Sequence, residues 1–216
     1  MNTAAALPAQ PIKLYRFFLS GHSHRVELFL SLLGVPFERV DVNLAVGEHK
    51  QPAFLAMNSF GQVPVIQDDD ITLADSNAIL VYLASKYDVG QWLPRDPVAA
   101  ATVQRWLSVA AGPVAFGPAK ARRAVLFKAP IDTETAIAQA HELFVLMETE
   151  LTNKSFLTGN NPTIADLANY AYIAHAPEGN VSLDPYPHLR NWLQRIEALP
   201  GFVPMVKSAV GLGCLT

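Results

Sequence analysis

Gln62-Val63-Pro64-Val65-Ile66 is followed by a helical pattern that begins at Asp75-Ser76, and these two strings decide how the chain is interpreted. Pro64 stands where a short strand should begin, and proline occurs at strand starts, edges or bulges because it has no N–H to donate. The backbone N–H and C=O of Val63 would then point outward, ready to pair with an extended peptide. A helix that begins at Asp75-Ser76 offers backbone donors and a dipole that favour a carboxylate. Together the two strings predict a site for a short, charged, peptide-like ligand.

The composition predicts a soluble protein of the cytoplasm. The 216 residues suffice for one large domain or two small ones, and 50% of them are hydrophobic while 16% are charged, which argues against disorder. The formal net charge of -3 argues against binding to nucleic acid, which needs clustered Lys and Arg. The Ala- and Pro-rich start has neither the basic flank nor the apolar run of a signal peptide. No segment has the length that spans a bilayer, so we expect no membrane partner.

Cysteine and histidine usage argues against a metal site. The single cysteine, Cys214, allows no disulfide framework, CxxC pair or Cys-based zinc site, and we expect it to be inert within the tail. His22 and His24 are two residues apart, a spacing that does not form a metal pair on a helix. We therefore expect no metal.

The first part of the chain predicts the element order β-α-β-α-β-β-α. Apolar residues alternate in the strands and recur at helical spacing in the helices, with Gly34 and Pro36 ending the first helix. The predicted elements are a strand over 12–19, a helix over 26–33, a strand over 40–44, a weakly helical segment over 47–58, a hairpin of 63–66 and 71–74 around Asp68-Asp69-Asp70, and a helix over 76–87.

Beyond a Gly- and Pro-containing linker over 89–97, the pattern contains no credible strand. Thr163-Ile164-Ala165-Asp166 resembles a capping box at the start of a buried helix. The other predicted helices are one over 99–127 bent at Pro113 and Pro118, one from Asp132 to about Thr152, and two over 187–199 and 201–210. The fold class is therefore α/β followed by all-α, with domains over 11–88 and 98–216.

This arrangement resembles the cytosolic glutathione transferases over nearly the whole chain, from Pro11 to about Val210. The strings that carry the resemblance are Val63-Pro64, Asp75-Ser76-Asn77-Ala78-Ile79 and Asn161-Pro162-Thr163-Ile164-Ala165-Asp166. The resemblance implies a thioredoxin-like glutathione-binding domain, a helical domain that lines the electrophile site, and a cis peptide bond before Pro64. It also implies a homodimer, a role in detoxification, and glutathione as co-substrate with a small electrophile.

The string Ser20-Gly21-His22-Ser23-His24-Arg25-Val26 is similar to the serine-type motif of the zeta and theta branches. The resemblance implies that Ser20 carries the catalytic hydroxyl. A thiol with a pKa of about 8.5 is little ionised at neutral pH, and a hydroxyl donor beside a helix start favours its thiolate. Three alternatives stay open: Ser20 is a plain helix cap, Ser23 faces the sulfur, or His22 polarises the thiol or the substrate.

A tyrosine mechanism is not expected. Tyr15 resembles the nucleophile-activating tyrosine of other branches, but it lies inside the first predicted strand. Phe17 and Phe18 occupy the positions nearer the end of that strand.

The remaining ligand contacts follow from the resemblance. Val63, held by Pro64, would pair through its backbone with the cysteinyl unit of glutathione. Asp75, where many relatives have Glu, would meet the γ-glutamyl ammonium, and Ser76 the γ-glutamyl carboxylate.

The glycyl carboxylate has three candidate partners in the sequence. Lys50 and Gln62 are the candidates, and His49 is a weaker one. The alternative for Lys50 is solvation, which is usual for a single lysine in a polar segment.

The helical domain holds the candidates for the second substrate. Trp106, Phe116 and Arg123 are the expected pocket residues, with buried core as the alternative for Trp106. For the pair Arg122-Arg123 we favour a solvated face over an anion-attracting site. Asp166 is expected to cap a helix and to have no catalytic role.

The sequence thus predicts a glutathione transferase that conjugates the glutathione thiolate to a hydrophobic electrophile. One alternative is another glutathione-dependent enzyme: an isomerase, a dehalogenase or a peroxidase. His22 stands where zeta enzymes have a cysteine, which argues against a true zeta enzyme. The other alternative is a non-enzymatic binding protein that keeps the fold.

Overall fold

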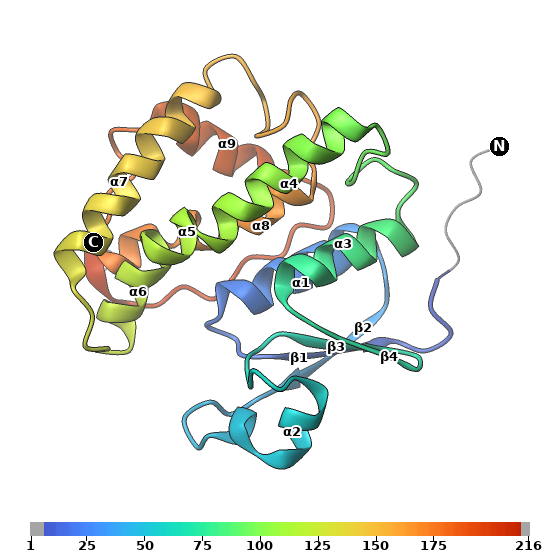
Figure 1. Ribbon diagram of the computed structural model, residues 1–216. Helices are drawn as coiled ribbons and strands as arrows, with labels where there is room; N and C mark the ends of the chain where they lie inside the picture. Colours follow the sequence, from blue (N-terminus) through green and yellow to red (C-terminus); the bar gives the residue numbers. More distant parts are fainter. Residues whose placement is uncertain (1–6, 213–216) are drawn as a thin grey trace. The chain divides into compact units, whose positions relative to one another are not determined.

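The chain divides into two compact units in a computed structural model that describes residues 7–212 (Figure 1). Unit 1 consists of the residues up to Arg95 together with Leu199–Met205, and unit 2 of Asp96–Ala198 together with the residues from Val206 onward. Cys214 lies outside the described residues. Within residues 7–212, no helix is long and apolar enough to cross a membrane.

Unit 1 is built on a mixed four-stranded sheet in the order β2-β1-β3-β4. β1 pairs in parallel with β2 and antiparallel with β3, which in turn pairs antiparallel with β4. The strands are β1 (Ile12–Arg16), β2 (Phe37–Asp41), β3 (Val65–Asp68) and β4 (Ile71–Ala74). The observed element order confirms the prediction of an α/β unit.

Helices cover both faces of this sheet, with α1 and α3 on one face and α2 on the other (Figure 1). Their bounds are α1 (Gly21–Leu32), the short 3-10 helix η1 (Glu48–Lys50), α2 (Pro52–Met57) and α3 (Ser76–Tyr87). Successive strand residues face opposite sides, so Leu14 is fully buried while Tyr15 joins the cluster around Phe54 of α2. The burial of both faces fixes the register of the strands.

Three predicted strands have wrong boundaries. The strand predicted over 63–66 covers Val65–Asp68. β1 ends at Arg16 rather than Leu19, because the chain turns where the N–H of Ser20 donates to the C=O of Phe17 at 2.9 Å. The second strand covers Phe37–Asp41 rather than 40–44, since it pairs with β1 from Ile12↔Phe37 onward.

Unit 2 is helical, and its helices are α4 (Pro97–Ala111), α5 (Pro113–Phe116), α6 (Pro118–Leu126), α7 (Thr133–Glu150), α8 (Ile164–Ala174), the 3-10 helix η2 (Ala176–Gly179) and α9 (Pro187–Glu197). α8 is buried on nearly all sides and packs against α4 and α9, while α6 packs against α7 and η2. The predicted capping box is present: Asp166 Oδ2 accepts the N–H of Thr163 at 2.8 Å. Its Oδ1 accepts the N–H of Leu157 and the indole N–H of Trp192, both at 2.9 Å.

The single bent helix predicted over 99–127 is three helices in the structure. The interruptions fall at Gly112 and Gly117, each directly before a proline that cannot donate a backbone hydrogen bond. Gly117 also lies so close to α7 that an added Cβ would be 2.9 Å from the backbone N of Ala140.

The helix predicted over 201–210 is also wrong. Residues 203–208 have no regular secondary structure, and Gly201 has a φ of +89°. Pro204 lacks an N–H and disfavours a helical conformation of the residue before it. The segment Leu199–Met205 instead packs on unit 1, where His24 Nε2 lies 2.8 Å from the C=O of Val203.

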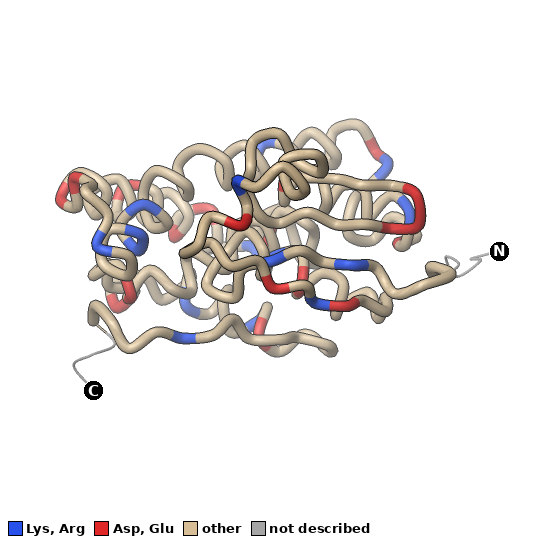
Figure 2. Tube along the Cα trace, turned by 90° about the horizontal axis from the view of Figure 1, so that it is seen from below, with Lys and Arg blue, Asp and Glu red and all other residues tan. Residues whose placement is uncertain are grey.

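Charged residues of both signs are interspersed along the described trace (Figure 2). The local exceptions are short, such as the acidic hairpin turn Asp68–Asp70. Asp68 itself is buried and accepts hydrogen bonds from Tyr82, Lys86 and Tyr87, so it joins β3 to α3.

Candidate functional site

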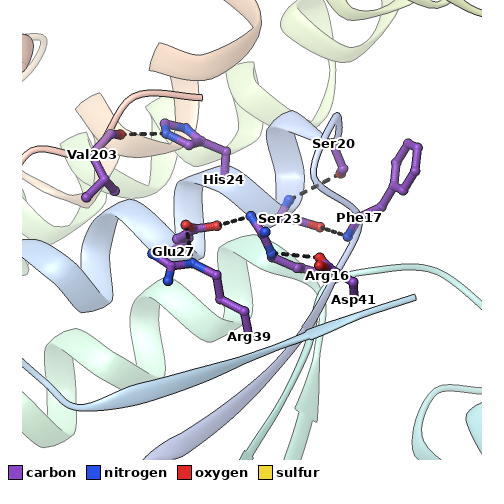
Figure 3. A network of polar contacts seen from close by, with 9 residues as sticks. All are labelled: Arg16, Phe17, Ser20, Ser23, His24, Glu27, Arg39, Asp41 and Val203. Atoms are coloured by element: carbon purple, nitrogen blue, oxygen red, sulfur yellow. Dashed lines mark hydrogen bonds and ion pairs between the residues drawn. The ribbon is translucent and has the colours of Figure 1, made fainter. Parts of the chain in front are cut away.

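Ser20 begins the candidate site as the N-cap of α1. Its backbone is extended, with φ -87° and ψ 117°, and its Oγ accepts the N–H of Ser23 at 3.2 Å (Figure 3). The side-chain oxygen is the acceptor in this bond, so the hydroxyl proton is available for another partner. The N-cap geometry considered as an alternative for Ser20 is therefore present, and it is compatible with a donor role for the same hydroxyl.

Ser23 is a less suitable partner for a ligand because its side chain is buried, with 1% of the residue exposed. Its Oγ accepts the backbone N–H of Phe17 at 3.2 Å, which holds the turn between β1 and α1 (Figure 3). The two serines thus have different surroundings: Ser20 is half-buried and Ser23 is enclosed.

His22 reaches the start of α3. Its Nδ1 lies 3.2 Å from the hydroxyl oxygen of Ser76, although the two residues are 54 positions apart in sequence. Arg25, which is 1% exposed, donates from Nη1 to the same oxygen at 3.2 Å and to Asn77 Oδ1 at 2.6 Å. Two residues of α1 therefore surround the hydroxyl at the first residue of α3.

Asp75 is the N-cap of α3, and its Oδ1 accepts the N–H groups of Asn77 and Ala78, both at 2.9 Å. Its φ of +70° lies in a region that residues other than glycine seldom occupy, and such conformations concentrate at ligand sites. The residue is exposed, so its carboxylate is open to solvent while it caps the helix.

The loop before β3 ends at Val63-Pro64, whose peptide bond is cis, as the resemblance implied. Val63 is half-buried, and no hydrogen bond of its backbone N–H or C=O is formed within residues 7–212. Gln62 is exposed, and its C=O accepts a hydrogen bond from Asn58 Nδ2 at 2.8 Å.

Lys50 lies against the same loop and is not simply solvated. Its Nζ donates to the C=O of Phe60 at 3.1 Å and to the C=O of Gly61 at 2.9 Å. His49 is half-buried beside it in η1.

The predicted residues of unit 1 therefore fall into two groups. His22 and Ser76 are in direct contact at the starts of α1 and α3, with Ser20 and Asp75 capping the same two helices. Lys50 contacts the loop that leads to Gln62 and Val63. The sequence interpretation missed Arg25 and Asn58, and the only signal for Arg25 was a charge within an apolar helical pattern.

Tyr15 does not take part in this arrangement. Its hydroxyl donates to Gln67 Oε1 at 2.9 Å across the paired strands β1 and β3. Phe17 and Phe18, whose ring centroids are 5.0 Å apart, follow β1.

An ionic network joins the middle of α1 to the sheet. Glu27 accepts Arg16 Nη1 and Arg39 Nε, each at 2.7 Å, and Arg16 Nε lies 3.0 Å from Asp41 (Figure 3). These pairs join α1 to β1 and β2, so they hold the helix whose N-terminus carries Ser20.

The candidate pocket residues of unit 2 differ in exposure. Trp106 is buried and its C=O accepts Asn169 Nδ2 at 3.1 Å, while Phe116 is 60% exposed and Arg123 is exposed. The solvated face expected for Arg122 is wrong, because Arg122 is 1% exposed and its Nε pairs with Glu178 Oε2 at 2.7 Å.

Glu178 is the centre of a buried polar cluster in unit 2. Its Oε1 lies 2.6 Å from His175 Nδ1 and accepts the N–H of Ser208 at 3.1 Å. Burial alone would raise the pKa of Glu178, but the hydrogen bonds from His175, Ser208 and Arg122 outweigh it and lower the pKa to about 2. The described residues contain no group of three or more His, Cys, Asp or Glu that could hold a metal ion.

Comparison with known proteins matches both units to one family. Residues 10–85 match the family model of the glutathione S-transferase N-terminal domain, and residues 111–200 match that of the C-terminal domain. Glutathione S-transferase 3 of Zea mays is 35% identical over 209 residues, which cover 89% of this chain and 91% of the maize protein. Human glutathione S-transferase theta-1 is 34% identical over 88% of this chain and 84% of its own length.

Solved structures agree with this match. The crystal structure of a glutathione S-transferase from Pseudomonas fluorescens superposes with a TM-score of 0.87. It shares 32% sequence identity, and the alignment covers 92% of this chain and all of that chain.

Proposed function

The chain belongs to the glutathione S-transferase family, and on that premise we propose that the Ser20 hydroxyl stabilises the glutathione thiolate for attack on a small hydrophobic electrophile. One observation carries the proposal. Ser20 caps α1 with its oxygen as acceptor, so its proton is available at the positive end of a 12-residue helix.

Ser20 acts by favouring the charged form of the sulfur. A hydroxyl that donates to the thiolate lowers the pKa of the thiol, and the helix start adds positive potential. The thiol proton leaves to water, and the sulfur lone pair forms the new S–C bond while the electrons of the broken bond go to the leaving group. The burial of Ser23 and the contact of His22 with Ser76 favour Ser20 over both alternatives.

Val63, Asp75 and Ser76 hold the rest of glutathione in this proposal. The backbone of Val63, next to Pro64, pairs with the cysteinyl unit as an added strand would. The exposed carboxylate of Asp75 meets the γ-glutamyl ammonium, while the hydroxyl and the backbone N–H of Ser76 meet the γ-glutamyl carboxylate. Lys50 and Gln62 serve the glycyl carboxylate.

The electrophile belongs to the helical domain over 98–216, beyond the linker 89–97 and the glutathione-binding domain over 11–88. Phe116 and Arg123 offer exposed apolar and cationic groups there, and Trp106 contributes from the core. We further propose a cytoplasmic homodimer with a role in detoxification. A sedimentation measurement that finds only monomer at micromolar concentration would remove the dimer from this account.

Turnover assays test the proposed reaction. Purified protein is supplied with glutathione and, in separate assays, with halide, epoxide, peroxide and disulfide substrates. The proposal expects conjugation of the halide or epoxide. Peroxide or disulfide turnover alone would instead favour the alternative of another glutathione-dependent enzyme. Failure to bind immobilised glutathione would favour the binding-protein alternative.

A further inference from the structure

We infer that Lys50 and Asn58 are positioning residues that hold the loop 58–62 so that the Val63 backbone is presented to glutathione, an inference that rests on the proposed function. The sequence predicted Lys50 as a partner of the glycyl carboxylate, with solvation as the alternative. Its ammonium instead lies over two backbone carbonyls of this loop, at 3.1 Å from Phe60 O and 2.9 Å from Gly61 O. Hydrogen bonds from a charged donor are stronger than those between neutral groups.

The Asn58 side chain bonds to the middle and to the last residue of the loop. Its Nδ2 donates to the C=O of Gln62 at 2.8 Å, and its Oδ1 accepts the N–H of Phe60 at 3.1 Å. The C=O of Asn58 accepts the N–H of Gly61 at 2.8 Å. Asn58 is only 8% exposed, so these bonds are shielded from water on the side of Asn58.

Close packing leaves the loop little freedom. Gly61 has a φ of +57°, and a Cβ added there would lie 2.7 Å from the C=O of His49 and 2.9 Å from Lys50 Nζ. The loop is therefore closely packed against η1 at Gly61, the residue whose C=O accepts a hydrogen bond from Lys50.

The consequence for the site follows from the order of the carbonyls. Those of Phe60, Gly61 and Gln62 are each bound by a side-chain donor of Lys50 or Asn58. Val63 comes next, and its backbone groups form no hydrogen bond within residues 7–212. Lys50 and Asn58 therefore fix three successive peptide groups, and the next backbone groups, those of Val63, are left for the ligand. This arrangement pre-organises the edge that binds the cysteinyl unit.

A positioning role for Lys50 and a role only as a ligand of the glycyl carboxylate predict different binding results. Lys50 has three donors and the loop uses two, so the third remains for the glycyl carboxylate of glutathione. A residue that only binds this carboxylate has no effect on a ligand that lacks it. A residue that positions Val63 affects both ligands.

The test compares glutathione with γ-glutamylcysteine, which has no glycine unit. For Lys50→Met we expect the Kd and KM of both ligands to rise by about tenfold, the loss expected for charge-assisted hydrogen bonds, with kcat changing less. Asn58→Asp, which keeps the acceptor for Phe60 but replaces the donor to Gln62, should also weaken both ligands. Lys13→Met, an exposed lysine on β1, is the matched control and should leave both constants unchanged.

Three results decide the inference. A loss with glutathione and none with γ-glutamylcysteine would overturn it and leave Lys50 as a carboxylate ligand only. Unchanged binding of both ligands would overturn it as well. Amide hydrogen exchange of the ligand-free protein is a measurement that is independent of the proposed function. Lys50→Met should speed exchange at the Gly61 N–H while the amides of the sheet stay protected. Unchanged protection of the Gly61 N–H would contradict the positioning role.

Discussion

The Nδ1 atom of His22 lies 3.2 Å from the hydroxyl oxygen of Ser76, so the first turn of α1 contacts the first residue of α3. Arg25 donates to the same oxygen, which leaves the hydroxyl proton of Ser76 to a neutral His22 or to a ligand. His22 therefore belongs with the γ-glutamyl end of the proposed site rather than with the thiol.

This relationship predicts the kinetic effect of His22→Ala. We expect KM for glutathione to rise by about fivefold, the effect of one lost hydrogen bond, with a smaller change in kcat. Steady-state kinetics at varied glutathione concentration measure both constants. A fall in kcat at constant KM would instead assign His22 to the thiol. His188→Ala on α9 is the control and should leave both constants unchanged.

Asp75 combines two roles that one substitution can separate. Asn caps helices as well as Asp does and tolerates a positive φ, so Asp75→Asn should leave the free energy of unfolding within about 0.5 kcal/mol of the wild type. The variant loses the charge opposite the γ-glutamyl ammonium, and we expect the Kd for glutathione to rise by about tenfold. Asp75→Ala should show the same binding loss together with about 1 kcal/mol of destabilisation. Wild-type affinity of Asp75→Asn in calorimetry would refute the ammonium contact.

Local signals in the sequence account for much of the fold. The strand 71–74 and the helix 76–87 were predicted with their observed bounds because turn residues and a capping aspartate lie next to them in the chain. The end of β1 at Arg16 was missed, since strand length depends on the pairing with β2. The helix predicted over 201–210 was wrong because the contact that holds this segment, His24 with Val203, joins residues 179 positions apart and leaves no local signal.

The site shows the same division between local and distant causes. Ser20 and Asp75 were identifiable because helix starts have a local signature. Arg122 and Arg123 are adjacent residues of one type, yet Arg122 is buried and Arg123 is exposed. Arg122 pairs with Glu178, which is 56 positions away and therefore gives no local signal. The hydrogen bond from Lys50 to the C=O of Gly61 likewise depends on the path of a loop, which the sequence does not specify.

Glu178 predicts an acid-sensitive component of stability. The pKa of Glu178 is about 2 in the folded protein, against an ordinary value of 4.5. Its contribution to the free energy of unfolding is therefore complete above pH 4.5 and is lost as the pH falls toward 2. The difference corresponds to about 3 kcal/mol. Urea unfolding of the wild type and Glu178→Gln at several pH values measures it.

The two proteins should differ most near neutral pH and converge in acid, because the protonated carboxyl no longer pairs with Arg122. Glu142→Gln, an exposed position on α7, should follow the wild type throughout. A stability gap between Glu178→Gln and the wild type that does not change with pH would show that the charge of Glu178 contributes nothing.

In the ionic network of Glu27, we expect substitutions of buried and exposed members to lower the free energy of unfolding by different amounts. The Glu27 side chain is 10% exposed and that of Arg39 is 46% exposed. Glu27→Ala removes the 2.7 Å pair of the largely buried Arg16, which keeps Asp41 at 3.0 Å, and should cost about 2 kcal/mol of unfolding free energy. Arg39→Ala removes an exposed pair and should cost less than about 1 kcal/mol. Equal losses in urea unfolding would mean that burial does not set the strength of this network.

The central claim is that the Ser20 hydroxyl stabilises the glutathione thiolate, and the ultraviolet absorbance of bound thiolate, titrated against pH, tests it most directly. In the wild type we expect the bound thiol to ionise below about 8.5, the value of an ordinary thiol. Ser20→Ala should bind glutathione but return the titration toward about 8.5, and kcat/KM should fall at neutral pH. Ser23→Ala, which removes the buried hydroxyl, should keep the low titration midpoint. An unchanged thiolate titration in Ser20→Ala would contradict the account.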